Sequence, residues 1–199
     1  DKHHAQGYGE YILAQSLDKT FSIHGCLSPL NTRVSVNKAI AITSRLYNSS
    51  DSTSKIVKYL SGSLSSLTEG VTASGGNLRF PDGERLFSNG ASSVSIKLPA
   101  SYCGNVEGLC GRFNPGTGYS DVWTDASRHL VNLTSQREIN YWGGGYYMGK
   151  FQTDFVSSWK VLPNASNALF TEAECPSGTF GVIDPNTVKP FDGCPSLEA

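Results

Sequence analysis

The sequence has little net charge and no long apolar run. Its 16 Lys and Arg are balanced by 17 Asp and Glu, for a formal net charge of −1. Binding to nucleic-acid phosphates needs clustered Lys and Arg, and the sequence has no such cluster, so we expect no nucleic-acid partner. Apolar runs such as Ala39–Ile42 are far too short to span a bilayer, and no transmembrane segment is predicted.

The sequence also lacks the motifs of common enzyme classes. It contains no G-x-S-x-G nucleophile elbow, and no Lys-Ser/Thr of a phosphate loop follows its glycines. The five cysteines form no C-x-x-C pair, and Cys103 and Cys110 are too far apart for a zinc knuckle. His24 lies on a strand face and His129 in a loop, so neither suggests a catalytic triad. We therefore predict no catalytic residues and no enzyme activity.

Serine and threonine are abundant, at 40 of 199 residues. This composition, together with 38% hydrophobic residues, favours a folded domain of strands and turns over long helices or disorder. Apolar patterns predict strands at residues 9–15, 20–26, 34–43, 56–60 and 93–98, and another near 151–162. Pro81-Asp82-Gly83 predicts a hairpin turn between two further strands. The fold class is therefore all-β, and we predict an antiparallel β-sandwich of short strands.

The composition changes after residue 162. Residues 163–199 contain five of the nine prolines and two of the five cysteines, with little apolar alternation. We predict a β domain at residues 1–162 and an irregular, disulfide-bearing C-terminal extension at residues 163–199. The simplest pairing within the extension is Cys175 with Cys194, which closes a short loop.

Three N-x-S/T sequons are candidate glycosylation sites if the chain is secreted. They begin at Asn48, Asn132 and Asn164. Sequons of this number permit an exported protein without establishing one.

The most specific pattern lies in the middle of the chain. Residues 108–111 read G-L-C-G, and residues 155–161 read F-V-S-S-W-K-V. An earlier stretch, residues 7–15, reads G-Y-G-E-Y-I-L-A-Q. In this order the segments resemble the von Willebrand factor type D domain, over roughly residues 7–162. Residues 1–4, D-K-H-H, match the family's usual opening G-D-P-H segment only in part.

The resemblance implies a non-catalytic, secreted module of a larger extracellular protein. Its role would be structural, adhesive or in assembly, and its partners would be other extracellular proteins or copies of itself. An alternative is a small-molecule or lipid-binding module, since related modules occur in lipid-transport proteins and secreted luciferases.

The resemblance also bears on the remaining cysteines. In the family, the cysteine of G-L-C-G usually bonds a cysteine upstream of the opening segment, and this sequence has no such residue. The implied arrangement pairs Cys26 with Cys103. It leaves Cys110 unpaired or bonded to another molecule.

The loop at residues 114–125 is a candidate calcium site. It reads N-P-G-T-G-Y-S-D-V-W-T-D and offers the hard oxygens that Ca²⁺ prefers. The resemblance implies Asn114 and Asp121 as ligands. Arg112 stands where the family usually has Asn, and a guanidinium cannot bind a cation. The alternative is an ordinary surface loop in which these side chains cap turns.

Aromatic residues surround three consecutive glycines at residues 143–145. Tyr141 and Trp142 precede the glycines, and Tyr146 and Tyr147 follow them. Tyr and Trp are favoured at protein interfaces because they bury a large area with few torsions. We therefore regard these four residues as candidate interaction residues. The alternative is that they pack beneath the sandwich.

Overall fold

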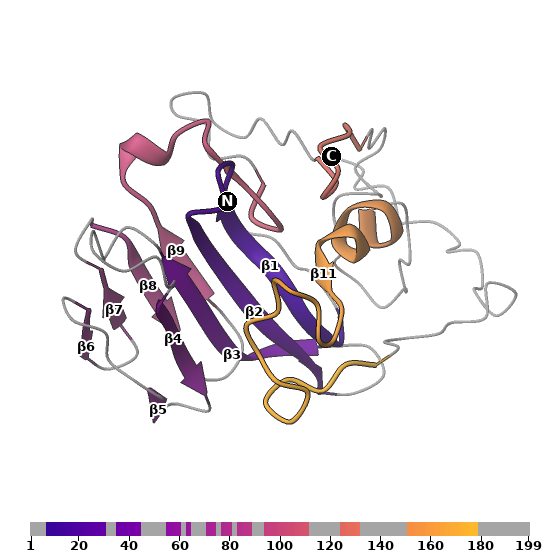
Figure 1. The fold of residues 1–199 in the computed structure, drawn as a ribbon, viewed down its shortest axis with the longest axis horizontal. Helices are drawn as coiled ribbons and strands as arrows, with labels where there is room; N and C mark the ends of the chain where they lie inside the picture. Colours follow the sequence, from indigo (N-terminus) through magenta and orange to yellow (C-terminus); the bar gives the residue numbers. More distant parts are fainter. Residues whose placement is uncertain are drawn as a thin grey trace, which may run out of the picture.

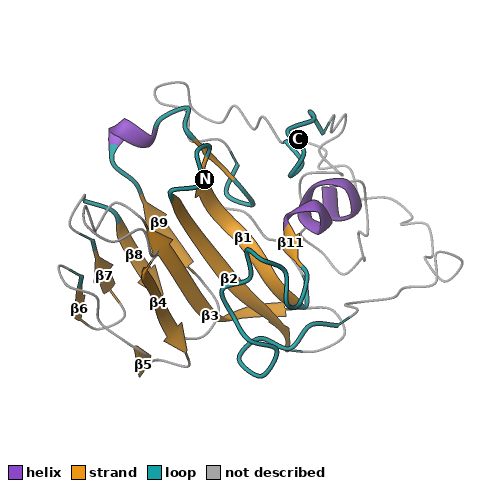
Figure 2. Cartoon of the chain, viewed as in Figure 1, coloured by secondary structure: helices purple, strands orange, loops and turns teal. Residues whose placement is uncertain are grey.

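The structure is a computed structural model. It describes residues 7–30, 35–44, 55–60, 63–64, 71–74, 77–80, 83–88, 94–111, 124–131 and 151–178. These residues form two antiparallel sheets and a few short helices, with connecting loops (Figures 1 and 2). A disulfide joins Cys26, in the first part of the chain, to Cys175, near the C-terminal end of the described residues. The prediction of an all-β fold with antiparallel sheets is therefore confirmed.

The larger sheet carries the long strands of the first half of the chain. Its order is β10-β1-β2-β3-β4-β5, and β11 also pairs with β1. The strands are β1 (Gly9–Ser16), β2 (Phe21–Pro29), β3 (Ser35–Ser44), β4 (Lys55–Leu60), β5 (Ser63–Leu64), β10 (Val106–Glu107) and β11 (Lys160–Val161). Because β1 to β4 follow one another as neighbours, this part of the sheet is a meander of antiparallel strands (Figure 1).

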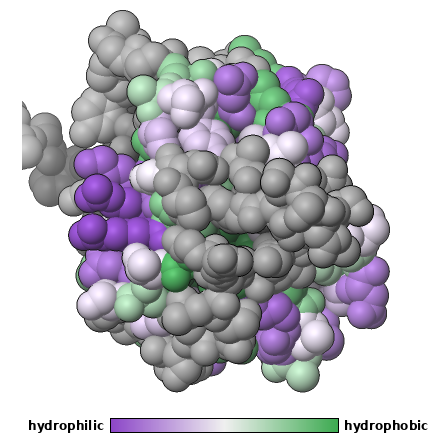
Figure 3. Space-filling model, turned by 60° about the vertical axis from the view of Figure 1, so that its left-hand side comes forward, coloured by the Kyte–Doolittle hydropathy of each residue, from purple (hydrophilic) through white to green (hydrophobic). Residues whose placement is uncertain are grey.

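The smaller sheet consists of four short strands in chain order. They are β6 (Thr72–Ser74), β7 (Asn77–Arg79), β8 (Arg85–Ser88) and β9 (Val94–Lys97). The predicted hairpin is confirmed, since β7 pairs with β8 and Gly83 N donates to Phe80 O at 3.0 Å. Gly83 has a φ of +94°, which suits a glycine at this turn. The described side chains on the face in Figure 3 are largely hydrophilic, with small hydrophobic areas between them.

The main core lies between the two sheets. Phe21, Ile23, Ile40 and Ile42 from the larger sheet pack in one buried cluster with residues of the smaller sheet such as Leu86. These residues alternate along β2 and β3, because successive side chains of a strand point to opposite faces. The opposite face of β2 and β3 is also covered, as described below.

The prediction of a strand near residues 151–162 is wrong for most of this segment. Residues Phe151–Val156 form a π-helix, η2, and Ser157–Trp159 form a short 3-10 helix, η3. Phe155, Val156 and Trp159 are all buried in one cluster, a spacing that a helical turn can bring to one side. Within residues 151–162, the strand is limited to β11, which pairs with β1 and places Val161 opposite Glu10.

A further 3-10 helix, η1 (Ala100–Tyr102), connects β9 to β10. None of the helices in the described part of the chain has the length and apolarity needed to cross a membrane.

Candidate functional site

The G-L-C-G loop at residues 108–111 lies against β1. Leu109 N donates to Ile12 O at 3.0 Å, and Cys110 N donates to Leu13 O at 2.9 Å. The register between β1 and β2 shifts after Ile12, as at a β-bulge. A bulge leaves one residue outside the regular ladder. Here that residue is Leu13, and its carbonyl accepts the hydrogen bond from Cys110 N.

Gly108 is required by the closeness of this contact. Its φ is +136°, and a Cβ at this position would lie 2.6 Å from Leu13 O. Gly111 also has a positive φ, of 74°, and its N–H donates to Gly108 O at 2.9 Å. The two glycines of the motif therefore make the sharp turn that carries Cys110.

Cys110 is exposed and forms no disulfide with another described cysteine. Although part of the residue reaches the surface, the protein atoms around it desolvate the thiolate and raise the pKa of Cys110 to about 11. At neutral pH this side chain is therefore almost entirely a thiol.

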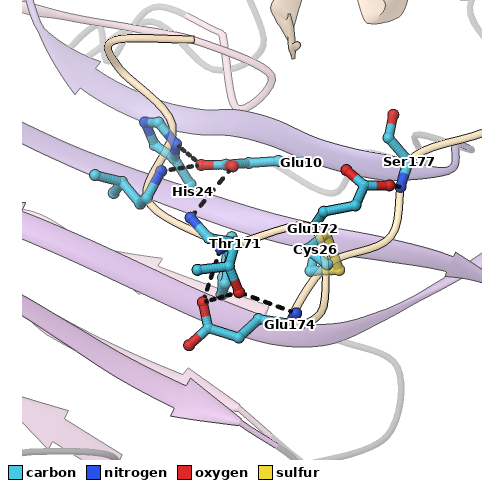
Figure 4. Close-up of a disulfide and its surroundings, with 10 residues drawn as sticks. Glu10, His24, Cys26, Thr171, Glu172, Glu174 and Ser177 are labelled. Carbon is cyan, nitrogen blue, oxygen red and sulfur yellow. Dashed lines mark hydrogen bonds and ion pairs between the residues drawn. A yellow bond between two sulfur atoms is a disulfide. The ribbon is translucent and has the colours of Figure 1, made fainter. Parts of the chain in front are cut away.

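A second candidate region covers the outer face of the larger sheet. Residues 165–178, which we call the strap, run across β1 and β2 (Figure 4). Phe170 and Cys175 of the strap are buried in one cluster with Cys26, Ala39 and Ala41. The strap therefore does for this face what the smaller sheet does for the other.

Glu10 and His24 form a buried pair beneath the strap. Glu10 Oε1 lies 2.5 Å from His24 Nδ1, and both residues are buried. The same carboxylate accepts two backbone N–H groups of the strap, from Leu169 at 2.7 Å and Phe170 at 3.3 Å. A buried carboxylate needs such donors to offset its loss of hydration. Glu10 thereby connects β1, β2 and the strap (Figure 4).

A capping box shapes the strap just before its cysteine. Thr171 N donates to Glu174 Oε2 at 2.8 Å, and Glu174 N donates to Thr171 Oγ1 at 3.3 Å. Glu174 also accepts from Lys58 Nζ of β4 at 2.6 Å. Desolvation opposes its ionisation, but the hydrogen bonds from Lys58 and Thr171 outweigh this effect and lower the pKa of Glu174.

The disulfide of the described chain joins Cys26 to Cys175, with a Cα–Cα distance of 5.7 Å. The predicted pairings of Cys26 with Cys103 and of Cys175 with Cys194 are therefore wrong. The Cys175–Cys194 pairing assumed a partner close by in the sequence, and the Cys26–Cys103 pairing followed the family pattern. In the structure, the strap returns across the sheet and places Cys175 over β2. Cys103 lies half-buried just after η1, and Cys194 lies outside the described residues.

A polar hollow of about 450 Å³ lies at the edge of the larger sheet. It is lined by Gln15, Leu17, Lys19, Glu107, Ala126, Ser127 and Arg128. Arg128 binds the buried carboxylate of Glu107 at 3.0 Å and donates to Leu17 O at 3.1 Å. Because these groups satisfy one another, we interpret the contact as an anchor for the hairpin at residues 124–130.

Several sequence-predicted residues lie outside the described part of the chain. They are Asn48, Asn114, Asp121, Asn132, Tyr141, Trp142, Tyr146, Tyr147 and Cys194. Asn164 is described and exposed, in a turn before the strap. In the described residues, no three His, Cys, Asp or Glu side chains gather as a metal site would require.

Sequence reasoning missed the residues that hold the strap, namely Glu10, Lys58 and Glu174. Two signals were present. Glu10 is a single acid within the otherwise apolar pattern of β1, and residues 171–174 read T-E-A-E, which fits a capping box. Neither signal indicates that residues about 160 positions apart in the chain are in contact.

Two antiparallel sheets, a cysteine-bearing glycine turn and a long-range disulfide together define a disulfide-stabilised β module. The family model for the von Willebrand factor type D domain matches residues 1–119, which is more than half of the chain. The chain therefore belongs to the von Willebrand factor type D domain family. A comparison with curated proteins gives no match. Type D domains are non-catalytic modules of larger extracellular proteins, with structural and assembly roles.

Proposed function

We propose that this chain is a non-catalytic structural module of a secreted protein, and that it joins other extracellular proteins or copies of itself through Cys110. The observation that carries the proposal is the geometry of the G-L-C-G loop. Two backbone hydrogen bonds to β1 fix the loop while its cysteine stays exposed. A fixed, exposed thiol on a module of an assembly family is suited to a covalent link.

The raised pKa of Cys110 favours a lasting link over rapid exchange. A thiol with a pKa of about 11 is a slow nucleophile at neutral pH, because little thiolate is present. It is also a slow leaving group once it is in a disulfide. These properties fit a structural cross-link better than a disulfide-exchange catalyst.

The test is the state of Cys110 in the secreted protein. We expect wild-type protein to contain disulfide-linked species on non-reducing gels, with Cys110 in an intermolecular disulfide by peptide mapping. Cys110→Ser should remove these species, whereas Ser101→Ala, at an exposed position of η1, should not. Recovery of Cys110 as a free thiol, with identical sedimentation of wild type and Cys110→Ser, would remove the proposal.

Calcium binding is a separate part of the proposed function, with Asn114 and Asp121 as ligands. Their amide and carboxylate oxygens are suitable for Ca²⁺. Calorimetric titration of chelator-treated protein should give binding heat that Asp121→Ala abolishes. Absence of heat at millimolar Ca²⁺ would count against a calcium site.

We also propose that Asn164 carries an N-linked glycan in the secreted protein. Its side chain lies in an exposed turn, and the sequon N-A-S continues through Ser166. Asn48 and Asn132 are proposed on their sequons alone. Enzymatic deglycosylation followed by mass spectrometry should convert each occupied Asn to Asp, and an unchanged Asn164 peptide would contradict the assignment.

The aromatic residues Tyr141, Trp142, Tyr146 and Tyr147 are proposed as part of the interaction surface. The double substitution Tyr146→Ala and Tyr147→Ala should weaken partner binding or self-association without lowering the melting temperature. Unchanged sedimentation and unchanged partner binding would assign these residues to packing instead.

A further inference from the structure

The outer face of the smaller sheet carries three positive charges side by side. Arg79 of β7 lies opposite Arg85 of β8, and Arg85 lies opposite Lys97 of β9 (Figure 1). All three residues are exposed, whereas their strand neighbours Leu78 and Leu86 point into the core. Neighbouring strands are about 4.8 Å apart, so these three residues, which we call the basic row, extend over roughly 10 Å. Only the register of the sheet brings them together, since the sequence shows no such cluster.

No acid of the described residues neutralises the basic row. Glu84 is next to Arg85 in the chain, but it is only 2% exposed and accepts a hydrogen bond from Tyr102 Oη at 2.6 Å, on the other side of the strand. Asp82 lies outside the described residues, and none of the ion pairs within the described part of the chain includes a residue of the row. Like charges directly opposite one another destabilise a sheet. The basic row therefore lowers the stability of the free protein, and a bound anion would remove this cost.

A second row of neutral side chains lies beside the basic row on the same face. Phe87 follows Arg85 by two positions on β8 and is 42% exposed, with Asn77 and Ser95 opposite it on β7 and β9. Residues two apart on a strand are separated by about 7 Å. The face thus combines cations for anionic groups with an aromatic ring and polar groups at the distance of one small ring system. This combination suits a charged sugar chain.

We propose that this face binds a sulfated polysaccharide, with sulfate groups on the basic row and a sugar ring over Phe87. The guanidinium groups of Arg79 and Arg85 present forks of N–H donors that match the oxygens of an oxoanion. Exposed cations in a row on an open sheet face suit an extended chain with repeating charges. The choice of a polysaccharide over a nucleic acid rests on the extracellular role proposed above. A lipid surface is less suitable, since membrane-surface binding calls for several large apolar side chains and the described outward side chains of β7 and β8 include one, Phe87.

Calorimetry with a short heparin fragment tests the proposal on the full chain. We expect binding to the sulfated fragment and none to the same fragment after desulfation. The affinity should fall with added NaCl, and a plot of log Kd against log salt concentration should have a slope of roughly 2–3 for three ion pairs. Absence of binding at low salt, or equal affinity for the desulfated fragment, would overturn the proposal. Tighter binding to single-stranded DNA or to phosphatidylserine vesicles would assign the face to another class of partner and contradict it as well.

The substitution Arg85→Gln separates a binding role from a structural one. It should weaken heparin binding by roughly two- to fivefold and lower the salt slope by about 1. Because it removes the like-charge contacts with both neighbours, the melting temperature should stay the same or rise. The matched control is Lys38→Gln, which removes one charge from an exposed position on β3 and should leave the affinity unchanged. Equal weakening by the two substitutions would show that net charge alone determines binding.

Two further variants complete the test. Combined substitution of Arg79, Arg85 and Lys97 by Gln should weaken binding by at least about tenfold, and a folded triple variant with wild-type affinity would contradict the proposal. Cys110→Ser should leave the affinity unchanged, because a short fragment in solution contacts one chain at a time and gains nothing from a covalent dimer. Failure of the Cys110 link and failure of polysaccharide binding are therefore distinguished.

Discussion

At the scale of single residues, Glu10 makes contacts far beyond its own strand. It lies on β1, yet its carboxylate forms hydrogen bonds with His24 of β2 and with two backbone N–H groups of the strap. A hydrogen bond to a charged group contributes roughly 1.5–3 kcal/mol when its loss leaves a buried partner unsatisfied. One side chain thus couples the start of the domain to residues about 160 positions later.

The substitution Glu10→Gln should lower the free energy of unfolding by about 2–3 kcal/mol. The amide is nearly isosteric, but its NH₂ group must face a donor, either His24 or the strap. Urea unfolding measures the loss, and hydrogen exchange at Leu169 and Phe170 should become faster. The control is Glu172→Gln, because Glu172 is exposed, lies in the same strap and accepts a hydrogen bond from the backbone N–H of Ser177. Equal effects of the two substitutions would contradict a special role for Glu10.

The reactivity of Cys110 should depend on pH in a way that reports its surroundings. An ordinary cysteine pKa is 9.0, whereas desolvation raises that of Cys110 to about 11. Between pH 9 and pH 11, Cys110 is therefore mostly a thiol in the folded state and mostly a thiolate in the unfolded state. Because the folded state holds its proton longer, this group stabilises the fold less as the pH rises through this window.

Alkylation by iodoacetamide, followed by mass spectrometry of the Cys110 peptide, checks this prediction. The rate in folded protein should keep rising to about pH 11, and in urea it should level off near pH 9. A plateau near pH 9 in both states would show that the loop does not desolvate the thiol.

At the scale of elements, the G-L-C-G loop depends on backbone space as well as on backbone angle. Gly108 and Gly104 both have positive φ, of 136° and 72°. A Cβ at Gly104 would meet nothing within 4 Å, but at Gly108 it would meet Leu13 O at 2.6 Å. A substitution at Gly104 therefore measures the cost of a positive φ alone, whereas one at Gly108 adds the clash and a φ that side chains adopt more rarely still.

We expect Gly104→Ala to lower the free energy of unfolding by about 1–2 kcal/mol, from conformation alone. Gly108→Ala should cost clearly more, because the loop must also move away from β1 and weaken the bond from Cys110 N to Leu13 O. Chemical denaturation gives the two values. Similar losses for both variants would mean that the loop adapts to the added methyl group.

The elements that the sequence predicts correctly are those with local signals. Alternation along β2 and the Pro-Asp-Gly turn depend on residues close together in the chain, and both are confirmed. The η2 helix was missed because Phe155, Val156 and Trp159 also suit a buried strand. The bulge after Ile12 was missed because it exists only where the loop after β10 arrives.

At the scale of the whole molecule, the disulfide closes most of the chain into one loop. Cys26 and Cys175 are separated by 149 positions. Their pairing is unpredictable from spacing, because five cysteines allow many connectivities. It follows instead from the path of the strap, which Glu10, Lys58 and the capping box at residues 171–174 determine.

Removing this bond should have a large effect on stability. For a loop of 149 positions the chain-entropy estimate is about 5 kcal/mol. The double variant Cys26→Ser and Cys175→Ser should therefore lose a large part of the free energy of unfolding, measured in urea. Cys110→Ser is the matched control and should change it little. A loss below about 1 kcal/mol would indicate that the unfolded chain is already compact.

The same bond also determines how the module carries mechanical load. Tension applied on the far sides of Cys26 and Cys175 passes through the two sulfur atoms and bypasses the 149 positions between them. About 500 Å of chain is thereby protected from stretching. Of the described strands, β1 and the first part of β2 lie outside the closed loop and would yield first. Under tension the domain would first lengthen through these segments, and the 149 positions between the two cysteines would extend only after the disulfide is reduced.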